Sequence, residues 1–190
     1  MPADDQRARE EGGGAQVPPG WEYNPSTWEQ RLPLVGLAMV GFFIATYLSL
    51  FQFNVISSVW DPFFGKGTRT ILTSRVSHVL PIPDAALGAF GYFADALSGV
   101  IGGKGRWRTM PWIVIVFGLA VGPLGVVSIM LVVFQPVLLD AWCTLCLASA
   151  VISIVMIGPA MDEFLASAQH IRREMANGKS SWRVFWGMKS

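Results

Sequence analysis

The sequence predicts an all-α integral membrane protein, built as a bundle of four transmembrane helices. Of its 190 residues, 52% are hydrophobic and only 14% are charged, whereas about a quarter of the residues in a soluble domain carry charge. The apolar residues are gathered into long runs, each close to the roughly twenty residues that cross a bilayer. Because lipid cannot satisfy backbone hydrogen-bonding groups, such segments must be helical.

Four apolar runs define the expected helices. The first should begin near "STWE", because Ser26 and Glu29 match the capping box, in which the two side chains satisfy free backbone N–H groups. Asp84 and Asp95 interrupt the second run, so its membrane signal is the weakest of the four. The expected helices span about 32–53, 83–102, 111–134 and 138–161.

The segments around these helices complete the expected domain organisation. Residues 1–24 are charged and then rich in Gly and Pro, which predicts a disordered tail. Residues 25–165 form the four-helix membrane domain. Residues 166–190 are expected to form a cytoplasmic or interfacial tail, because they combine Trp with basic residues, which suit the lipid headgroup level.

The distribution of Lys and Arg predicts the orientation in the membrane. Of the 14 basic residues, eleven fall before the first apolar run, after the fourth, or in the link between the second and third helices. The remaining three, Lys66, Arg69 and Arg75, fall in the long loop 54–82. The positive-inside rule therefore places both termini in the cytoplasm and the loop 54–82 on the outer side.

Composition excludes several classes of function. A net charge of +1 provides no basic field for nucleic acid. With two cysteines and two well-separated histidines, the chain lacks the ligands for a zinc site, so no metal is expected. Haem attachment needs His directly after the second cysteine, and Leu147 stands there.

Both cysteines, Cys143 and Cys146, form a C-x-x-C pair at the outer start of the fourth helix. Positions i and i+3 share a helix face, and the outer compartment is where disulfides persist. If Asp140 caps this helix, Cys143 lies in the first turn, where the helix dipole favours a thiolate. A redox pair is one interpretation; two small buried cysteines that fill a helix contact are the other.

The redox interpretation implies a hydrophobic electron acceptor beside the pair. Cys146 lies one turn deeper than Cys143 and is the better candidate to face a quinone ring. Trp142 and aromatic residues of the second helix, Phe90 foremost, are expected to stack on that ring.

The sequence allows two interpretations for each of two acidic residues in the second helix. Asp84 follows Pro83 at the helix start and is either a helix N-cap or a polar contact for the quinone. Asp95 is an intramembrane carboxylate, so it is either a proton-relay group or a bundle-facing structural residue.

The order of these parts resembles the vitamin K epoxide reductase family over about residues 26–165. "WCTLC" at 142–146 and "ILTSRVSHVLPIPDAALGAFGY" at 71–92 carry the resemblance. It implies a four-helix membrane protein that passes electrons from thiols to ubiquinone or menaquinone, in the manner of disulfide-bond formation. It also implies a thioredoxin-like extracytoplasmic partner and a bacterial inner membrane location.

The chain departs from the family pattern in the outer loop. The family's second cysteine pair, which relays electrons from the partner, would fall at about Trp60 and Thr68. The aromatic hydroxyl that follows the C-x-x-C pair in the family would fall at Ala150. These departures leave an alternative open: a catalytically degenerate member that serves as a non-enzymatic membrane scaffold or assembly partner.

Overall fold

The computed structural model describes residues 17–74, 77 and 82–188, and throughout this part the secondary structure is helical. Three helices are long and apolar enough to cross a membrane: α2 (Trp28–Gln52), α6 (Pro111–Leu139) and α7 (Thr144–Ala176). The fourth, α4 (Asp84–Val100), has 17 residues. Arg75 and the first sixteen residues of the predicted tail lie outside the described part of the chain.

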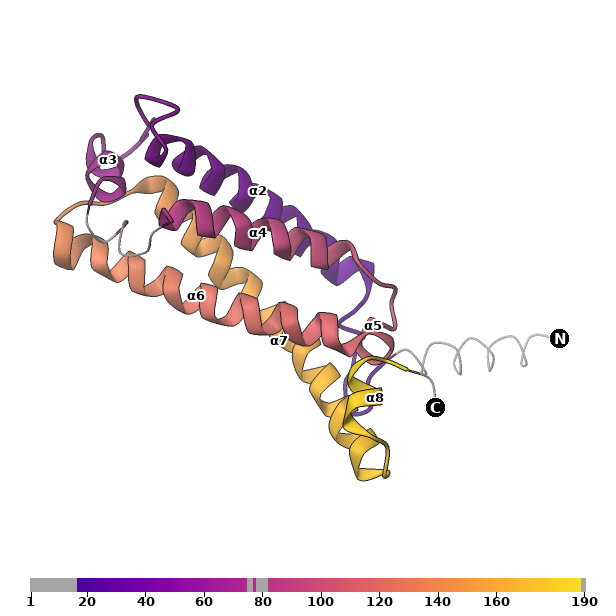
Figure 1. The fold of residues 1–190 in the computed structure, drawn as a ribbon. Helices are drawn as coiled ribbons and strands as arrows, with labels where there is room; N and C mark the ends of the chain where they lie inside the picture. The colour runs from indigo at the N-terminus through magenta and orange to yellow at the C-terminus, as the bar shows by residue number, and fades with distance from the viewer. Residues whose placement is uncertain (1–16, 75–76, 78–81, 189–190) are drawn as a thin grey trace.

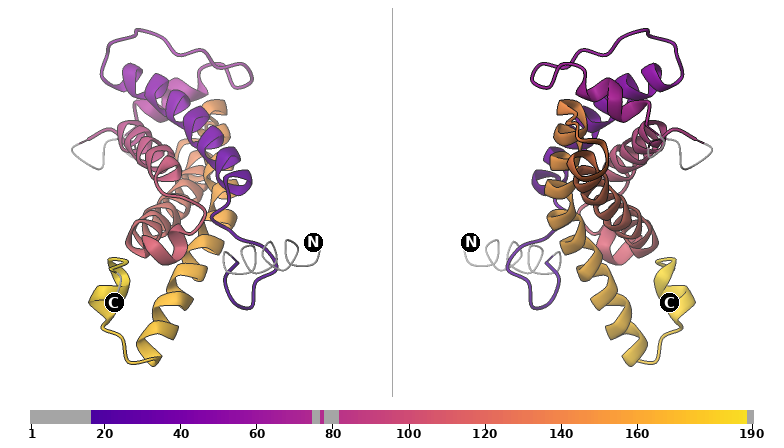
Figure 2. Two further views of the ribbon diagram at one scale, coloured as in Figure 1. Left: turned by 90° about the vertical axis from the view of Figure 1, so that its right-hand side faces the viewer. Right: turned by 90° about the vertical axis from the view of Figure 1, so that its left-hand side faces the viewer.

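The four long helices form an elongated bundle that confirms the predicted fold class (Figure 1). The most extensive contacts join α2 to α4 and α6 to α7, and α7 also packs against α2. The short helix α3 (Gly67–Leu72) lies at the end where α6 passes into α7 (Figure 1). The short helices α5 (Arg106–Thr109) and α8 (Ser181–Phe185) lie at the opposite end, as the side views in Figure 2 also show.

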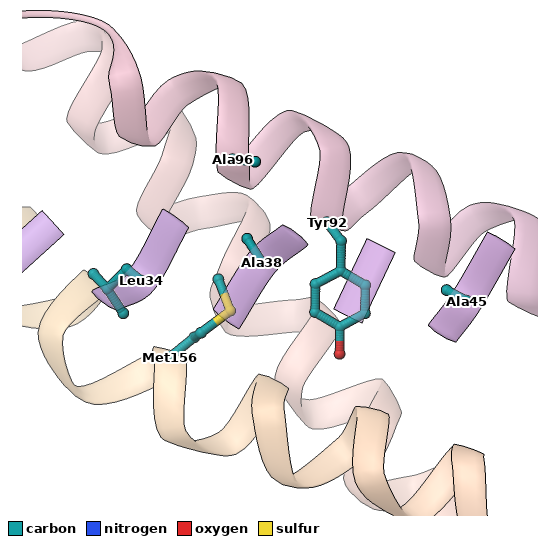
Figure 3. Close-up of a cluster of buried hydrophobic side chains, with 6 residues drawn as sticks. All are labelled: Leu34, Ala38, Ala45, Tyr92, Ala96 and Met156. Carbon is teal, nitrogen blue, oxygen red and sulfur yellow. The ribbon is translucent and has the colours of Figure 1, made fainter. Parts of the chain in front are cut away.

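The centre of the bundle is closed by small residues that let the helices approach. A Cβ atom at Gly41 of α2 would lie 2.6 Å from the ring of Tyr92, so the glycine makes room for this ring. Figure 3 shows Tyr92 leaving α4 and pointing its hydroxyl toward α7. Gly118 of α6 makes room for the ring of Phe164 in the same way. The central buried cluster consists of Leu34, Ala38, Ala45, Tyr92, Ala96 and Met156.

The first helix begins at Trp28, within the expected "STWE" stretch, but two of the predicted helix caps are wrong. Helix α2 follows Thr27 with no side-chain cap, and the hydroxyl of Ser26 instead donates to Glu163 of α7, so the capping box does not form. Helix α6 continues through Pro136 to Leu139, beyond the expected end. Asp140 therefore ends α6 in the left-handed conformation, which Asp tolerates, and does not cap α7.

A buried ionic network joins the helices at the end opposite the cysteines. Arg106 forms a salt bridge with Glu163 of α7, with its Nε donating at 2.5 Å. Arg31 donates to the carbonyl oxygens of Gly99, Ile101 and Gly102. Since these carbonyls lie at the C-terminal end of α4, the guanidinium satisfies groups that the helix itself leaves without partners.

Residues 17–24, which the sequence predicted to be disordered, contact the far end of α7. The indole of Trp21 donates to Gln169 at 3.1 Å, and the hydroxyl of Tyr23 donates to Asp162 at 2.6 Å. The side chain of Asn24 is buried and donates to the Lys104 carbonyl. Two aromatic residues of this segment make these contacts with α7, and the Gly- and Pro-rich composition gave no indication of them.

Candidate redox site

The two cysteines form a disulfide at the start of α7. Their Cα atoms lie 5.2 Å apart, within the range that a disulfide requires. Cys143 is the N-cap of the helix and not a residue of its first turn, because α7 begins at Thr144. Its Sγ accepts a hydrogen bond from the N–H of Cys146 at 3.1 Å. The N-cap position still exposes this sulfur to the free N–H groups and dipole of the helix.

Gln135 fixes the backbone of Cys143 and was not identified from the sequence. Its side-chain Oε1 accepts a hydrogen bond from the N–H of Cys143 at 3.0 Å, and its carbonyl accepts one from Ala141. The side chain is buried. Gln135 of α6 thereby stabilises both the turn between α6 and α7 and the backbone of Cys143. The only signal in the sequence is an amide in an otherwise apolar run.

A second group of contacts ties the loop 54–82 to the cysteine pair, through the carboxylate of Asp61. Asp61 accepts hydrogen bonds from the hydroxyls of Thr68 and Thr144 and from the amides of Phe63 and Phe64. Thr144 lies between the two cysteines in the sequence, and its bond measures 2.6 Å. We call these five residues the Asp61 cluster.

The Asp61 cluster strongly stabilises the charged form of its carboxylate. Desolvation acts to raise the pKa of Asp61, but the hydrogen bonds from Thr144, Thr68, Phe64 and Phe63 together outweigh it and hold the pKa well below its usual range. Asp61 therefore carries its negative charge at neutral pH.

The segment 61–72, which we call the cap segment, lies against the turn that carries the cysteines. A Cβ atom at Gly67 would overlap the carbonyl oxygen of Trp142, so only glycine permits this approach. The ring of Phe64 stacks on that of Trp142, with their centroids 6.2 Å apart. Cys143 is 0% exposed. The surrounding protein therefore encloses the Sγ atom of Cys143.

Cys146 instead opens onto a cavity of about 100 Å³ inside the bundle. Helices α2, α3, α4, α6 and α7 all contribute to its wall, which is mainly apolar. Few polar groups in an apolar cavity are typical of a site for a small hydrophobic ligand. We call it the Cys146 cavity; its polar and sulfur-containing residues are Asp84, Ser128, Gln135, Cys146 and Ser149.

The structure brings together some of the predicted site residues and not others. Asp84 lines the Cys146 cavity, where its Oδ1 accepts a 2.6 Å hydrogen bond from Gln52. Phe90 is 72% exposed on the outside of α4 and does not reach the cavity. Trp142 stacks on Phe64 and is not among the cavity residues. Ala150, where the family hydroxyl is expected, does line the wall.

The two positions aligned with the family's second cysteine pair differ in their surroundings. Trp60 is exposed, and its backbone N–H donates to the hydroxyl of Tyr47 at 3.0 Å. Thr68 is buried in the Asp61 cluster. At the two positions where the family pattern has redox-active cysteines, this chain therefore has residues that form hydrogen bonds.

A membrane-embedded helical bundle with a disulfide at the rim of an internal apolar cavity defines a class of membrane dithiol–disulfide proteins. Within that class, the chain belongs to the vitamin K epoxide reductase family, whose family model matches residues 32–160. Members of this family are thiol and quinone oxidoreductases. No match was found among curated proteins or among solved structures.

Proposed function

We propose that the protein is a quinone-coupled thiol–disulfide oxidoreductase, of the kind that drives disulfide-bond formation. The observation that carries this proposal is the position of the Cys143–Cys146 disulfide, one sulfur of which lines an apolar cavity among membrane helices. The proposed acceptor is ubiquinone or menaquinone, since both are hydrophobic two-electron acceptors that dissolve in the bilayer.

The proposed cycle begins with an external thiol. A donor thiolate attacks Cys143, which forms a mixed disulfide and frees the Cys146 thiolate. A second donor thiolate then attacks the mixed disulfide, so the donor leaves oxidised and Cys143 leaves reduced. The Cys143–Cys146 dithiol next re-forms its S–S bond and gives two electrons to the quinone, which takes up two protons and becomes a hydroquinone.

The residues around the Cys146 cavity suggest how the quinone is held. Asp84 and Gln135 would supply polar contacts to the quinone oxygens, and the leucine and alanine side chains would cover the ring. The proposal assigns no quinone contact to Phe90 or Trp142, because neither lines the cavity. The N-cap interpretation of Asp84 is wrong, because Pro83 is the N-cap and Asp84 is the first residue of α4, where its Oδ1 accepts the N–H of the adjacent Ala85.

A thiol donor can reach Cys143 only if the cap segment is displaced, because this residue has no exposed surface. We propose a thioredoxin-like extracytoplasmic protein or a small thiol as the donor, reaching Cys143 after the cap segment moves aside. The proposal places the cysteine end of the bundle on the outer face of a bacterial inner membrane. Both chain termini would then be cytoplasmic.

The enclosure of Cys143 also favours a second candidate function. A family member without the loop cysteine pair, with its first sulfur covered, fits a non-enzymatic membrane scaffold whose disulfide is structural. Such a protein would keep its disulfide regardless of thiols or quinone.

The two candidates are separated by turnover of the disulfide in purified protein. We expect an added thiol to reduce the pair and an added quinone to reoxidise it, and Cys143→Ser and Cys146→Ser each to abolish quinone reduction. Ser58→Ala, an exposed substitution in the loop, serves as the matched control. If both cysteine variants reduce quinone at the rate of the unmodified protein, the oxidoreductase proposal fails. A disulfide that resists thiol in the folded protein would support the scaffold.

A further inference from the structure

Asp95 is a carboxylate in the interior of α4, at membrane depth, that the proposed cycle does not use. Its side chain is only 6% exposed. It lines a small cavity of about 40 Å³ together with Tyr92, Ser128 and Ser153. Ionisable groups inside a membrane bundle are costly, and proton pathways are a common reason for keeping them.

A chain of hydroxyl groups begins at the wall of this small cavity. The Tyr92 hydroxyl lies 2.7 Å from the Ser153 Oγ and 2.9 Å from the Ser149 Oγ, and it donates to the Ser149 carbonyl. The Ser153 Oγ accepts from the Ser128 Oγ at 3.4 Å. These hydroxyls come from α4, α6 and α7, so the chain joins three helices of the bundle.

The hydroxyl chain connects Asp95 to the site beside the disulfide. Ser128 and Ser149 both line the Cys146 cavity, and Ser128 lines the small cavity as well. The small cavity exceeds the roughly 10–15 Å³ that one water needs, and its polar groups are sufficient to hold it. Asp95 therefore shares one small cavity with Tyr92, Ser128 and Ser153, and two serines of the hydroxyl chain, Ser128 and Ser149, also line the Cys146 cavity.

On its other side, Asp95 faces away from the cysteines. It lines a groove of about 230 Å³ between α4 and α6, which also includes Ser98, Ile101 and Trp112. Ile101 directly follows α4, at the end of the bundle opposite the disulfide. The carboxylate thus lies between this end and the hydroxyl chain.

We propose that Asp95, Tyr92 and the three serines 128, 149 and 153 form a proton path that supplies the quinone from the end of the bundle opposite the disulfide. This inference rests on the proposed function. When the Cys143–Cys146 bond re-forms, two electrons pass to the quinone and the two thiols release two protons on their own side. The hydroquinone needs two protons, and at least one of them arrives through Asp95. Turnover then moves charge across the membrane.

The test uses the full-length protein in liposomes that contain ubiquinone and a trapped pH indicator. Glutathione, which does not cross the bilayer, is added outside, so only molecules with the disulfide facing outward turn over. Valinomycin and potassium remove the membrane potential. We expect the lumen to become alkaline by about one proton or more for each quinone reduced.

Asp95→Asn should abolish lumenal proton uptake and slow quinone reduction about tenfold or more, and Asp95→Glu should restore both. Asp162→Asn is the matched control, because it removes an acidic group of α7 that contacts Tyr23 and lies outside the path. Tyr92→Phe keeps the core ring and removes the hydroxyl. It should show the same loss of uptake, and it decides the question if Asp95→Asn does not fold.

The outcomes separate this inference from the function on which it rests. Quinone reduction by the unmodified protein without a change in lumenal pH overturns the proton path and leaves the oxidoreductase standing. Full lumenal uptake in both Asp95→Asn and Tyr92→Phe overturns it as well. No quinone reduction by the unmodified protein overturns both proposals.

Discussion

Asp61 is the residue that joins the cap segment to the start of α7 through its carboxylate. Its carboxylate accepts from Thr68 of α3 and from Thr144, and so joins the loop to the first residue of α7. Hydrogen bonds to a charged group are stronger than neutral ones. The removal of that charge should therefore loosen the cap segment while it leaves the bundle in place.

We expect Asp61→Asn to speed reduction of the disulfide by a membrane-impermeant phosphine. The change weakens hydrogen bonds whose loss is worth about 1 kcal/mol after solvent screening, or roughly fivefold in rate. Asp140→Asn is the control, because it removes a similar charge from an exposed residue near the pair. Equal reduction rates for Asp61→Asn and the unmodified protein would show that the Asp61 cluster does not limit access.

The same residue predicts a pH dependence. The pKa of Asp61 is lowered in the folded protein, so its stabilising effect is complete above the ordinary carboxyl pKa, about 4, and is lost as the pH falls toward the folded value. The rate difference between Asp61→Asn and the unmodified protein should be constant from pH 8 to 5 and shrink below about pH 4. Phosphine reduction measured across that range tests this; a difference that grows on acidification would contradict it.

At the scale of elements, α3 acts as a cover because a glycine lets it approach the turn at Trp142. We expect Gly67→Ala to push α3 away, because the new Cβ would overlap the Trp142 carbonyl. Overpacking of this kind costs about 1–3 kcal/mol. Cys143 should then be reduced several times faster by the phosphine. Gly36→Ala, which adds its Cβ into open space on α2, is the control.

Two results would count against this account of α3. One is a Gly67→Ala protein that melts like the unmodified protein and reduces no faster. The other is an equal effect of Gly36→Ala, which would indicate general loosening of the bundle.

Element by element, the sequence predicted the helices well and their ends poorly. Apolar length identifies a span because lipid forces a helix, so all four predicted helices are confirmed in outline, three of them long and apolar enough to cross a membrane. Helix ends depend instead on competing partners. Ser26 bonds with Glu163, far away in the chain, and Pro136 does not stop α6. No local pattern contains that information.

The sequence predicted the two cysteines of the candidate site, but it indicated fewer of the residues around them. The C-x-x-C spacing alone indicated the pair, and Asp84 stands out as a charge at the start of an apolar run. Phe90 lies on the outer side of α4, because the buried face of this helix is formed by Gly91, Tyr92, Asp95, Ala96 and Gly99. Gln135 was missed because its role exists only once the α6–α7 turn has formed.

At the scale of the whole molecule, the two ends of the bundle differ in charge and define an orientation. Helices α5 and α8 mark one end, and α3 and the turn between α6 and α7 mark the other (Figure 1). Most of the basic residues belong to the α5 and α8 end, so the positive-inside rule predicts that this end is cytoplasmic.

Single cysteines introduced into a Cys143→Ser, Cys146→Ser background test this orientation. Phe63, which is 80% exposed at the cap segment, should react as Phe63→Cys with an impermeant maleimide in intact cells. Ser180→Cys, just before α8, should react only after the membrane is permeabilised. The reverse labelling pattern would place the disulfide in the cytoplasm.

The enclosure of Cys143 also bears on oxidative damage. A cysteine is converted irreversibly to sulfinic and sulfonic acids when peroxide reaches its thiolate. Here the first sulfur has no exposed surface, whereas Cys146 is partly exposed, so dissolved peroxide has the least contact with Cys143. The cap segment that covers Cys143 would therefore also protect this sulfur from overoxidation while it is reduced.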